Sequence, residues 1–345
     1  MGHLPIVNQE TIKDVFSEGY ISIKANLPDK KIIDVISSMF ADVLAVREGD
    51  LIFPWIIKGK NTKNIGFKYV FKAAGPPVFL RGNNAPIKIP LKREGLEFEK
   101  PLSEAEALDL WNKKLLWNII GKKSLGRGKG FSHQLPMEDD LILELLEEKN
   151  HNTGVKVNLK NKNINGELIH INTQQKLWDT NLKREIESSN KEEKISKLKL
   201  SGLPWVREKY FIFEKTLEAW LMENIDKLIC KNLLDMILPN SELIWFGSYL
   251  PFGVQGSNID IVLVQSKSGK KIVTVIELKV NSLSSKEFEH AANQSVDYSL
   301  FLKRAFDSFD EDVKLNPIVI SGLPKRNVDL SKTKITKEGL SPRWI

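Results

Sequence analysis

Cysteine and long apolar runs are the scarcest features of this 345-residue chain, which contains one cysteine, Cys230. A single thiol excludes an internal disulfide, so we expect a reducing cell interior and a packing role for Cys230. No apolar run is long enough to cross a bilayer, and residues 1–9 lack the basic stretch and apolar core of a secretory signal. We therefore expect a cytoplasmic protein with no membrane partner.

Two common site motifs are also missing. No second His or Cys lies at ligand spacing from His133, which is then expected to be a loop or core residue. Gly121 and Gly126 have the spacing of a Walker phosphate loop, but Arg127-Gly128 stands where the motif requires Lys and then Ser or Thr. The glycine-rich stretch is therefore not a Walker loop.

Basic residues outnumber acidic ones, with 51 Lys and Arg against 44 Asp and Glu and a formal net charge of +7 at pH 7. This surplus suits a polyanionic partner but does not require one. The length allows two domains, each with its own core. Residues 149–201 are rich in Asn and Lys and poor in large apolar side chains. We therefore predict one domain at 1–148, a connector at 149–201 in which residues 157–173 can still form small strands, and a second domain at 202–345.

Two apolar, β-branched runs, 259–264 and 272–279, flank a turn-like stretch and predict a β-hairpin. If Gln265 pairs with Ile272, residues 266–271 form the loop. A shift of the register by one residue would turn every side chain of one strand to the other face. The residues alone leave both registers open.

In the first register Asp260 lies directly across from Glu277, with their Cβ atoms roughly 5 Å apart. Two such carboxylates could share one divalent cation through oxygen ligands. Lys279 follows two residues later and points to the same face. Carboxylates within apolar strands are costly unless compensated, and either a bound cation or Lys279 would compensate them. A purely structural cluster of these three residues is the alternative interpretation.

A long helix should follow the hairpin. Ser284-Ser285-Lys286-Glu287 has the spacing of a capping box, and neither Gly nor Pro occurs from there to Phe306. Gln294 and Tyr298 are four residues apart and would share one face of this helix.

These polar positions occur in an order that resembles the motifs of the PD-(D/E)XK nuclease superfamily, including its Q-x-x-x-Y subset. The positions are Asp260, Glu277-Leu278-Lys279, Gln294 and Tyr298. The stretch 213–224 is similar to the helix that precedes the core of archaeal NucS-like nucleases, and Glu218 matches its acidic position. The resemblance covers roughly 205–325. The proline that names the superfamily is absent, because Ser257-Asn258-Ile259 precedes Asp260.

The resemblance implies an α/β fold with a restriction-endonuclease-like αβββαβ core in the C-terminal half. It also implies that Asp260, Glu277 and the Leu278 carbonyl hold Mg²⁺, with Mn²⁺ as an alternative, and that Lys279 positions a water. Glu218 would bind a second metal or orient the first metal's water. Gln294 and Tyr298 would fix the site or touch the backbone of the cut strand. Double-stranded DNA is the expected substrate, and a homodimer would supply two sites for two strands.

The N-terminal half resembles EVE-type domains of the PUA-like fold. The resemblance rests on Arg47-Glu48-Gly49-Asp50 before a predicted strand, on the strand at 66–71, and on Leu4-Pro5-Ile6-Val7 followed by Gly19-Tyr20-Ile21-Ser22. It implies a mixed α/β domain with a small barrel and an aromatic cage that accepts a modified or flipped base. The aromatic candidates for that cage are Trp55, Phe67, Tyr69, Trp111, Trp117 and Phe131. The alternative for each is a place in the core.

A basic, glycine-rich loop is predicted at 121–133. Four of its residues are cations, namely Lys122, Lys123, Arg127 and Lys129. Such a loop can hold nucleic-acid phosphates through its side chains and its backbone N–H groups, or it can simply be solvated.

The combined prediction is a metal-dependent endonuclease with a reader of modified bases, as in modification-dependent restriction. A NucS-like repair or structure-selective nuclease is the first alternative. A non-catalytic nucleic-acid-binding or structural protein with the same core is the second. A nucleotidyltransferase is less favoured, because Gly247-Ser248 lacks the two spaced acidic residues that should follow closely.

Overall fold

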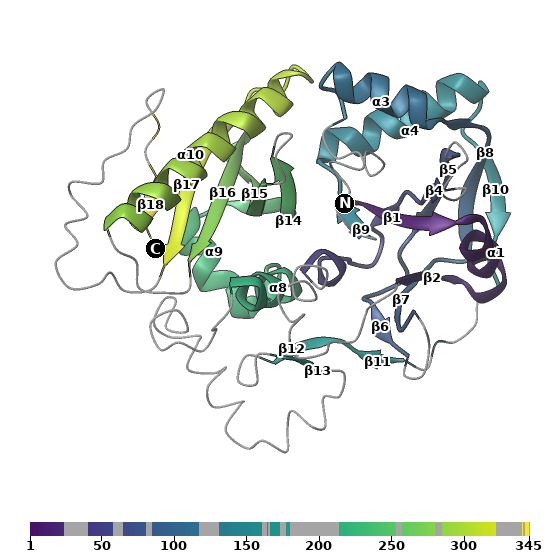
Figure 1. The fold of residues 1–345 in the computed structure, drawn as a ribbon, viewed down its shortest axis with the longest axis horizontal. Coiled ribbons are helices and arrows are strands. Elements are labelled where there is room, and N and C mark those ends of the chain that lie inside the picture. The colour runs from purple at the N-terminus through teal and green to yellow at the C-terminus, as the bar shows by residue number, and fades with distance from the viewer. Residues whose placement is uncertain are drawn as a thin grey trace. The chain divides into compact units, whose positions relative to one another are not determined.

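The computed structural model describes residues 1–23, 41–57, 65–80, 85–116, 131–160, 164, 166–172, 177–179, 214–252, 257–279, 285–321, 340 and 342–344 (Figure 1). These residues form two compact units, each described here by itself. The first contains the described residues from Met1 to Ile169 except Ala41, and the second contains Ala41 and those from His170 onward. No helix among the described residues is long and apolar enough to span a membrane.

The second unit is built on a five-stranded sheet in the order β14-β15-β16-β17-β18. Its strands are β14 (Glu242–Phe252), β15 (Ser257–Lys267), β16 (Lys270–Lys279), β17 (Lys314–Ser321) and β18 (Arg343–Trp344). The first three strands are antiparallel neighbours, whereas β16, β17 and β18 run parallel. Its other elements are β12 (His170–Asn172), β13 (Leu177–Asp179), α8 (Glu214–Asn224), the 3-10 helix Leu228–Cys230, α9 (Lys231–Ile237) and α10 (Ser285–Asp307).

The predicted succession of helix, three strands, helix and strand is present as α8, β14, β15, β16, α10 and β17. The parallel step from β16 to β17 needs a crossover, and α10 supplies it while packing on both strands (Figure 1). The assignment of this α/β arrangement to the nuclease fold stays a prediction.

The register predicted for the hairpin is confirmed. Gln265 pairs with Ile272, and the ladder between β15 and β16 continues in that register to Ile261 and Ile276. The loop is shorter than predicted, because the strands extend to Lys267 and Lys270.

Ser268 and Gly269 form a two-residue turn between these strands, with φ angles of 52° and 73°. Two successive positive φ angles are typical of the type I′ turn, whose twist matches that of the flanking strands. Because a two-residue turn of this type matches the twist of the strands, the pairing continues through residues 266–267 and 270–271, although these residues are polar.

The long helix is confirmed as α10. Its buried side chains include Phe288, Ala291, Val296 and Leu302, which supply an apolar stripe toward the sheet. The predicted capping residue Ser284 lies outside the described residues.

The first unit is a mixed α/β arrangement of two sheets. The larger has the order β10-β8-β5-β3-β1-β4, with β9 paired to β1, and the smaller has the order β11-β6-β7-β2. Its strands are β1 (Gly2–Asn8), β2 (Tyr20–Ile23), β3 (Leu51–Ile52), β4 (Trp55–Ile57), β5 (Gly66–Lys72), β6 (Val78–Phe79), β7 (Ile87–Pro90), β8 (Glu94–Leu102), β9 (Phe131–His133), β10 (Val155–Asn158) and β11 (Glu167–Leu168). Its helices are α1 (Gln9–Glu18), α3 (Glu104–Asn112) and α4 (Pro136–Asn150).

The boundary between the units lies later than the predicted end of the first domain at residue 148. β10 pairs with β8, and β11 pairs with β6, so both strands belong to the first unit. The polar composition after residue 148 predicts a connector, yet exposed edge strands can also be polar. The small barrel expected from the EVE-like resemblance stays a prediction.

Helix ends in the first unit follow local capping chemistry. Asn8 accepts a hydrogen bond from the Thr11 N–H at 2.8 Å and starts α1, which ends at Gly19 with φ of 75°. Ser103 and Glu106 form a capping box that starts α3.

Buried polar groups connect β1 to the turn before β3. The His3 ring on β1 contacts an Asp50 carboxylate oxygen through Nε2 at 2.8 Å and the Nδ1 of His133 on β9 at 3.1 Å. His133 Nε2 lies 3.3 Å from Asp42 Oδ1. The Arg47 N–H also donates to Asp50 at 2.7 Å. The Gly-Asp turn noted in the sequence thus fixes β1 beside β3, and His133 is a core residue, as expected.

This cluster gives the first unit a pH-dependent stability. Burial lowers the pKa of His3 to about 4, although Asp50 opposes the shift. Burial is the largest single effect on Asp50 and raises its pKa, but the hydrogen bond and charge of His3, the N-terminal ammonium and the Arg47 N–H together outweigh it and lower the pKa. Both shifts contribute stability that is present near neutral pH. The His3 contribution is lost as the pH falls from 6.5 toward 4, and the Asp50 contribution at still lower pH.

Asp139 on α4 gives stability the opposite dependence on pH. Burial raises its pKa well above the usual value, and its Oδ1 has no hydrogen-bond partner within the described residues. The neutral form is therefore favoured in the folded state, and this contribution is lost as the pH rises through the raised pKa.

We expect Asp139→Asn to raise the free energy of unfolding at pH 8, because the amide keeps the shape and carries no buried charge. The gain should shrink toward zero as the pH approaches 4, where the wild-type carboxyl is protonated. Guanidinium unfolding of both proteins between pH 4 and pH 8 measures this difference. An equal gain at both ends of that range would show that Asp139 does not carry the linkage.

The turn provides a second stability prediction. Ser268→Asn should stabilise the hairpin by up to about 1 kcal/mol, because Asn accepts a positive φ at lower cost than Ser. Gly269→Ala should destabilise it by roughly 1–2 kcal/mol. No atom lies within 4 Å of a Cβ built at Gly269, so the loss would report backbone strain alone. Urea unfolding of the three proteins tests both signs, and unchanged midpoints would contradict the turn geometry.

Candidate active site

Asp260 is fixed against β16 by a bond between its side chain and the backbone. The paired residues of the hairpin reach Ile261 and Ile276, and beyond them Asp260 Oδ2 accepts a hydrogen bond from the Leu278 N–H at 2.9 Å. Asp260 is 8% exposed and is set in a run of buried apolar residues. The carboxylate thus takes a position beside Glu277-Leu278-Lys279, as the register predicts.

Lys279 binds the same oxygens that the resemblance assigns to a metal. Its Nζ donates to Glu277 Oε1 at 2.6 Å and to the Leu278 carbonyl at 3.1 Å. Glu277 is only 3% exposed, and the Lys279 side chain is 19% exposed. In this short contact the ammonium compensates the buried carboxylate. Two of the three predicted metal ligands therefore already converge on a cation.

Gln294 and Tyr298 join this group from α10, which packs on β16. Gln294 Nε2 donates to the Tyr298 hydroxyl oxygen at 3.2 Å. Burial raises the pKa of Tyr298, and the negative charge of Glu277 raises it further, whereas the Gln294 hydrogen bond lowers it. Asp260 also raises this pKa and Lys279 lowers it. The hydroxyl therefore lies within the field of all three charged residues, and the structure brings the five predicted positions together.

Glu218 is placed differently. It is fully buried on α8, and α8 contacts β14 and β16. In the part of the chain that the structure describes, no three or more His, Cys, Asp or Glu residues gather as they would to hold a metal. Glu218 therefore does not form one ligand set with Asp260 and Glu277. The predicted role of Glu218 at a second metal has no support in this geometry.

The donor set near β16 suits a hard cation. Two carboxylates and one backbone carbonyl are oxygen ligands of the kind that Mg²⁺ prefers, and waters usually complete its octahedral shell. Asp260, Glu277 and the Leu278 carbonyl are the oxygen donors of that set, and Lys279 shows that two of them can hold a positive charge together.

The structure contradicts the predicted nucleic-acid contact at Trp55. Its side chain is 1% exposed and packs edge-to-face on Phe67, with ring centroids 4.8 Å apart. Both rings belong to the core of the first unit, together with Phe53 and Phe98. A base could not stack on Trp55 in this structure, because the apolar contacts that hold β4 on β5 already cover the ring. The predicted phosphate contacts Lys122, Lys123, Arg127 and Lys129 lie outside the described residues.

An aromatic cluster on β5 and α1, in which Phe16 and Tyr69 are half-buried and Phe71 is fully buried, is only partly predicted by the sequence. Tyr69 stacks on Phe71 with a centroid distance of 5.8 Å, and Phe16 meets the Tyr69 ring edge-on at 5.4 Å. The Tyr69 hydroxyl and Lys68 Nζ both bind Glu97 Oε1, at 3.2 and 2.6 Å. The sequence drew attention to Tyr69 alone. Phe16 and Glu97 could be added only from the pairing of β5 with β8 and the packing of α1.

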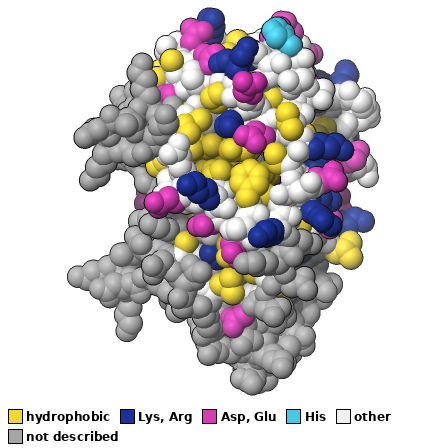
Figure 2. Space-filling view, turned by 90° about the vertical axis from the view of Figure 1, so that its right-hand side faces the viewer, with side chains coloured by type: hydrophobic (Ala, Val, Ile, Leu, Met, Phe, Trp, Pro, Cys, Tyr) yellow, Lys and Arg dark blue, Asp and Glu magenta, His cyan; other side chains and the backbone are white. Residues whose placement is uncertain are grey.

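Figure 2 shows one face of the molecule, the side drawn at the right of Figure 1. Apolar side chains gather in the middle of this face, and Lys, Arg, Asp and Glu side chains surround them. A patch of this kind, apolar with a polar rim, is typical of binding surfaces.

Comparisons with known proteins leave the family open. No protein-family description matches the sequence, and no curated protein matches it. A crystal structure of a Pseudomonas putida protein aligns with 42% of this chain and 99% of its own, at 11% identity and a TM-score of 0.28. A crystal structure of a Pseudomonas syringae protein aligns over the same shares, at 10% identity and a TM-score of 0.27. Similarities this low carry no argument about fold or function.

Proposed function

We propose that the chain is a metal-dependent endonuclease that hydrolyses phosphodiester bonds of double-stranded DNA. The observation that carries the proposal is the convergence of Asp260, Glu277 and Lys279 with Gln294 and Tyr298 on α10. Buried carboxylates, an ammonium and hydroxyl and amide donors are groups that metal-assisted phosphodiester hydrolysis can use. Their order along the chain is that of the PD-(D/E)XK motifs.

The residues have separate roles in this proposal. Asp260, Glu277 and the Leu278 carbonyl would hold Mg²⁺, which polarises the scissile phosphate and lowers the pKa of a bound water. The Leu278 N–H keeps the Asp260 carboxylate oriented toward β16. Lys279 orients the attacking water and offsets the negative charge that develops on the phosphate. Gln294 and Tyr298 donate hydrogen bonds to the backbone of the strand that is cut.

The first unit would supply recognition. Phe16 and Tyr69 present half-buried aromatic surface over the buried Phe71, and a base can stack on such partly exposed rings. Lys68 and Glu97 at the Tyr69 hydroxyl add polar groups that could read a base edge. A reader of modified bases joined to the nuclease unit would make a modification-dependent restriction endonuclease, acting as a homodimer when both strands are cut.

One observation favours a second candidate, a nucleic-acid-binding protein without catalysis. The 2.6 Å contact between Lys279 and Glu277 already neutralises the carboxylate, so the cluster is stable as a structural ion pair. A NucS-like repair nuclease would use the same site, with a first unit that is not EVE-like. Substrate choice separates these candidates.

Cleavage of duplex DNA tests the proposal. Purified protein is incubated in Mg²⁺ or Mn²⁺ with unmodified and cytosine-modified duplexes, beside Asp260→Asn and Lys279→Ala. We expect cleavage of the modified duplex and a loss of roughly 100-fold or more in each variant. Asn keeps an oxygen for the Leu278 N–H, so Asp260→Asn removes the charge with little change of shape.

Lys231→Ala, an exposed lysine on α9, is the matched control and should cut at the wild-type rate. Equal cutting of both duplexes would remove the modified-base reader and favour the repair nuclease. Absence of cutting on modified, unmodified, mismatched, branched and single-stranded DNA, with retained binding, would refute the nuclease and leave the binding protein.

The α10 residues allow a finer prediction. Tyr298→Phe and Gln294→Ala should lower kcat roughly 10- to 100-fold, because each removes a hydrogen bond to a charged group. Duplex binding should change little, since the contact is expected to strengthen in the transition state. Single-turnover cleavage and equilibrium binding separate the two effects, with Tyr20→Phe in the first unit as a control. A parallel loss of binding and folding would indicate a purely structural role.

A further inference from the structure

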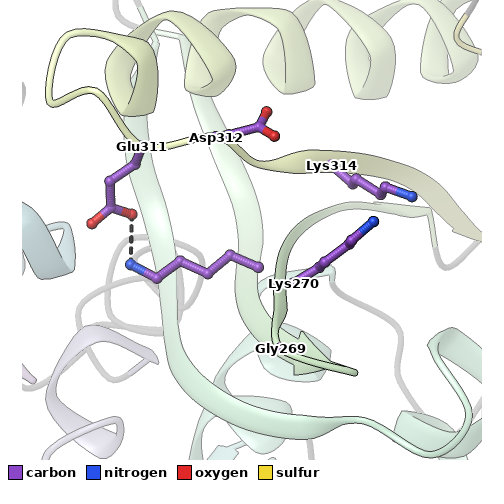
Figure 3. A pocket seen from close by; sticks show the side chains of 6 residues that line it. Gly269, Lys270, Glu311, Asp312 and Lys314 are labelled. Atoms are coloured by element: carbon purple, nitrogen blue, oxygen red, sulfur yellow. Dashed lines mark hydrogen bonds and ion pairs between the residues drawn. The ribbon is translucent and has the colours of Figure 1, made fainter.

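A polar cavity of about 370 Å³ lies at the turn end of the second unit's sheet. It is lined by Gly269, Lys270, Lys271, Glu311, Asp312 and Lys314 (Figure 3). The β15–β16 turn forms one wall, and the segment between α10 and β17 forms the other. The volume is within the range of roughly 300–1,000 Å³ seen for ligand sites, but this lining is charged rather than apolar. The cavity therefore suits a small charged group.

The strand register aligns three lysines at this end of the sheet. Lys267 pairs directly with Lys270, and Ile272, two residues after Lys270, pairs with Lys314. Because side chains alternate along a strand and paired residues share a face, Lys267, Lys270 and Lys314 lie on the same face. Like charges directly opposite each other destabilise a sheet. A bound anion would relieve this repulsion.

The two neighbouring acids do not pair with Lys270 or Lys314 among the described residues. Glu311 instead binds Lys271, on the opposite face, at 2.7 Å, as the dashed line in Figure 3 shows. Asp312 lines the cavity as well, but no hydrogen bond or ion pair joins it to Lys270 or Lys314. Its charge also contributes to the raised pKa of Lys303, whose chief cause is the hydrogen bond from Lys303 to Asp307.

The cavity carries a net positive charge, because three lysines line it against two carboxylates. Within the described residues, no carboxylate pairs with Lys267, Lys270 or Lys314. The Lys270 and Lys314 side chains extend toward the same side of the cavity in Figure 3. Each ammonium offers up to three N–H donors and no acceptor, so the site recognises an anion with several oxygens.

We propose that this cavity binds a phosphate group through Lys270 and Lys314, with Lys267 adding positive charge beside them. Lysine binds phosphate as a point charge on a flexible stem, which fits an open cavity of this kind. The group could belong to a nucleic-acid backbone or to a free polyphosphate, since both present the same tetrahedral oxygens.

This site is separate from the candidate active site. Glu277 lies seven residues beyond Lys270 on β16, which at about 3.3 Å per residue is roughly 23 Å along the strand. The inference therefore does not rest on the proposed nuclease activity. It can hold if the chain cuts no DNA, and it can fail if the chain does.

The test measures binding of two probes, tripolyphosphate and a short DNA duplex, by the full-length chain without divalent metal. Asp260→Asn is present throughout, so that no duplex is cut. Lys270→Glu and Lys314→Glu are compared with Lys231→Glu, which makes the same charge change at another exposed lysine of the unit. Far-UV circular dichroism checks folding, and Lys270→Gln and Lys314→Gln provide neutral versions.

We expect Lys270→Glu and Lys314→Glu each to weaken binding of a phosphate probe about tenfold or more, and Lys231→Glu to weaken it far less. Weaker binding of both probes indicates a nucleic-acid backbone. In that case the salt dependence of duplex binding should also fall by about one phosphate contact for each lysine replaced. Weaker binding of tripolyphosphate alone indicates a free polyphosphate. Affinities for both probes that match the Lys231→Glu control would overturn the proposal.

Discussion

The register between β15 and β16 sets the position of nearly every group in the candidate active site. It brings Asp260 to the Leu278 N–H and leaves Glu277 and Lys279 on the face that α10 covers. A shift of one residue would turn Asp260 away from Glu277 and bury it among the apolar residues of the other face. The site is thus a direct consequence of the register in which these two apolar runs pair.

Charge compensation is the second constraint. A carboxylate that is less than a tenth exposed is costly in the fold unless a hydrogen bond or a cation compensates it. Asp260 accepts the Leu278 N–H, and Lys279 compensates Glu277 through the same Glu277 and Leu278 oxygens that a metal would use. In the proposed enzyme these oxygens would change partners, and the ammonium would then be available to the phosphate. The structural ion pair and the catalytic site are therefore two uses of one arrangement.

The features predicted correctly from the sequence are those that depend on local periodicity. The alternation in β15 and β16 predicted the register that brings Asp260 to the Leu278 N–H, and the four-residue spacing predicted the contact between Gln294 and Tyr298. The failures concern long-range contacts. The burial of Trp55 against Phe67 and the pairing of β10 with β8 depend on residues distant in the chain. Composition alone assigned β10 to a connector because an edge strand can be as polar as a linker.

The two ends of β16 differ in charge, and this difference has consequences for any polyanion. The amino end carries Lys270 beside Lys267 and Lys314, whereas the carboxyl end carries Asp260 and the ion pair between Glu277 and Lys279. A phosphate approaching the sheet is therefore attracted more strongly to the lysine end, unless a further cation binds the carboxylates at the other end. Added divalent metal would therefore favour approach to the acidic end and leave the lysine end unchanged. The metal dependence of phosphate binding at the two ends thus follows from the strand's own charge pattern, whatever reaction the site performs.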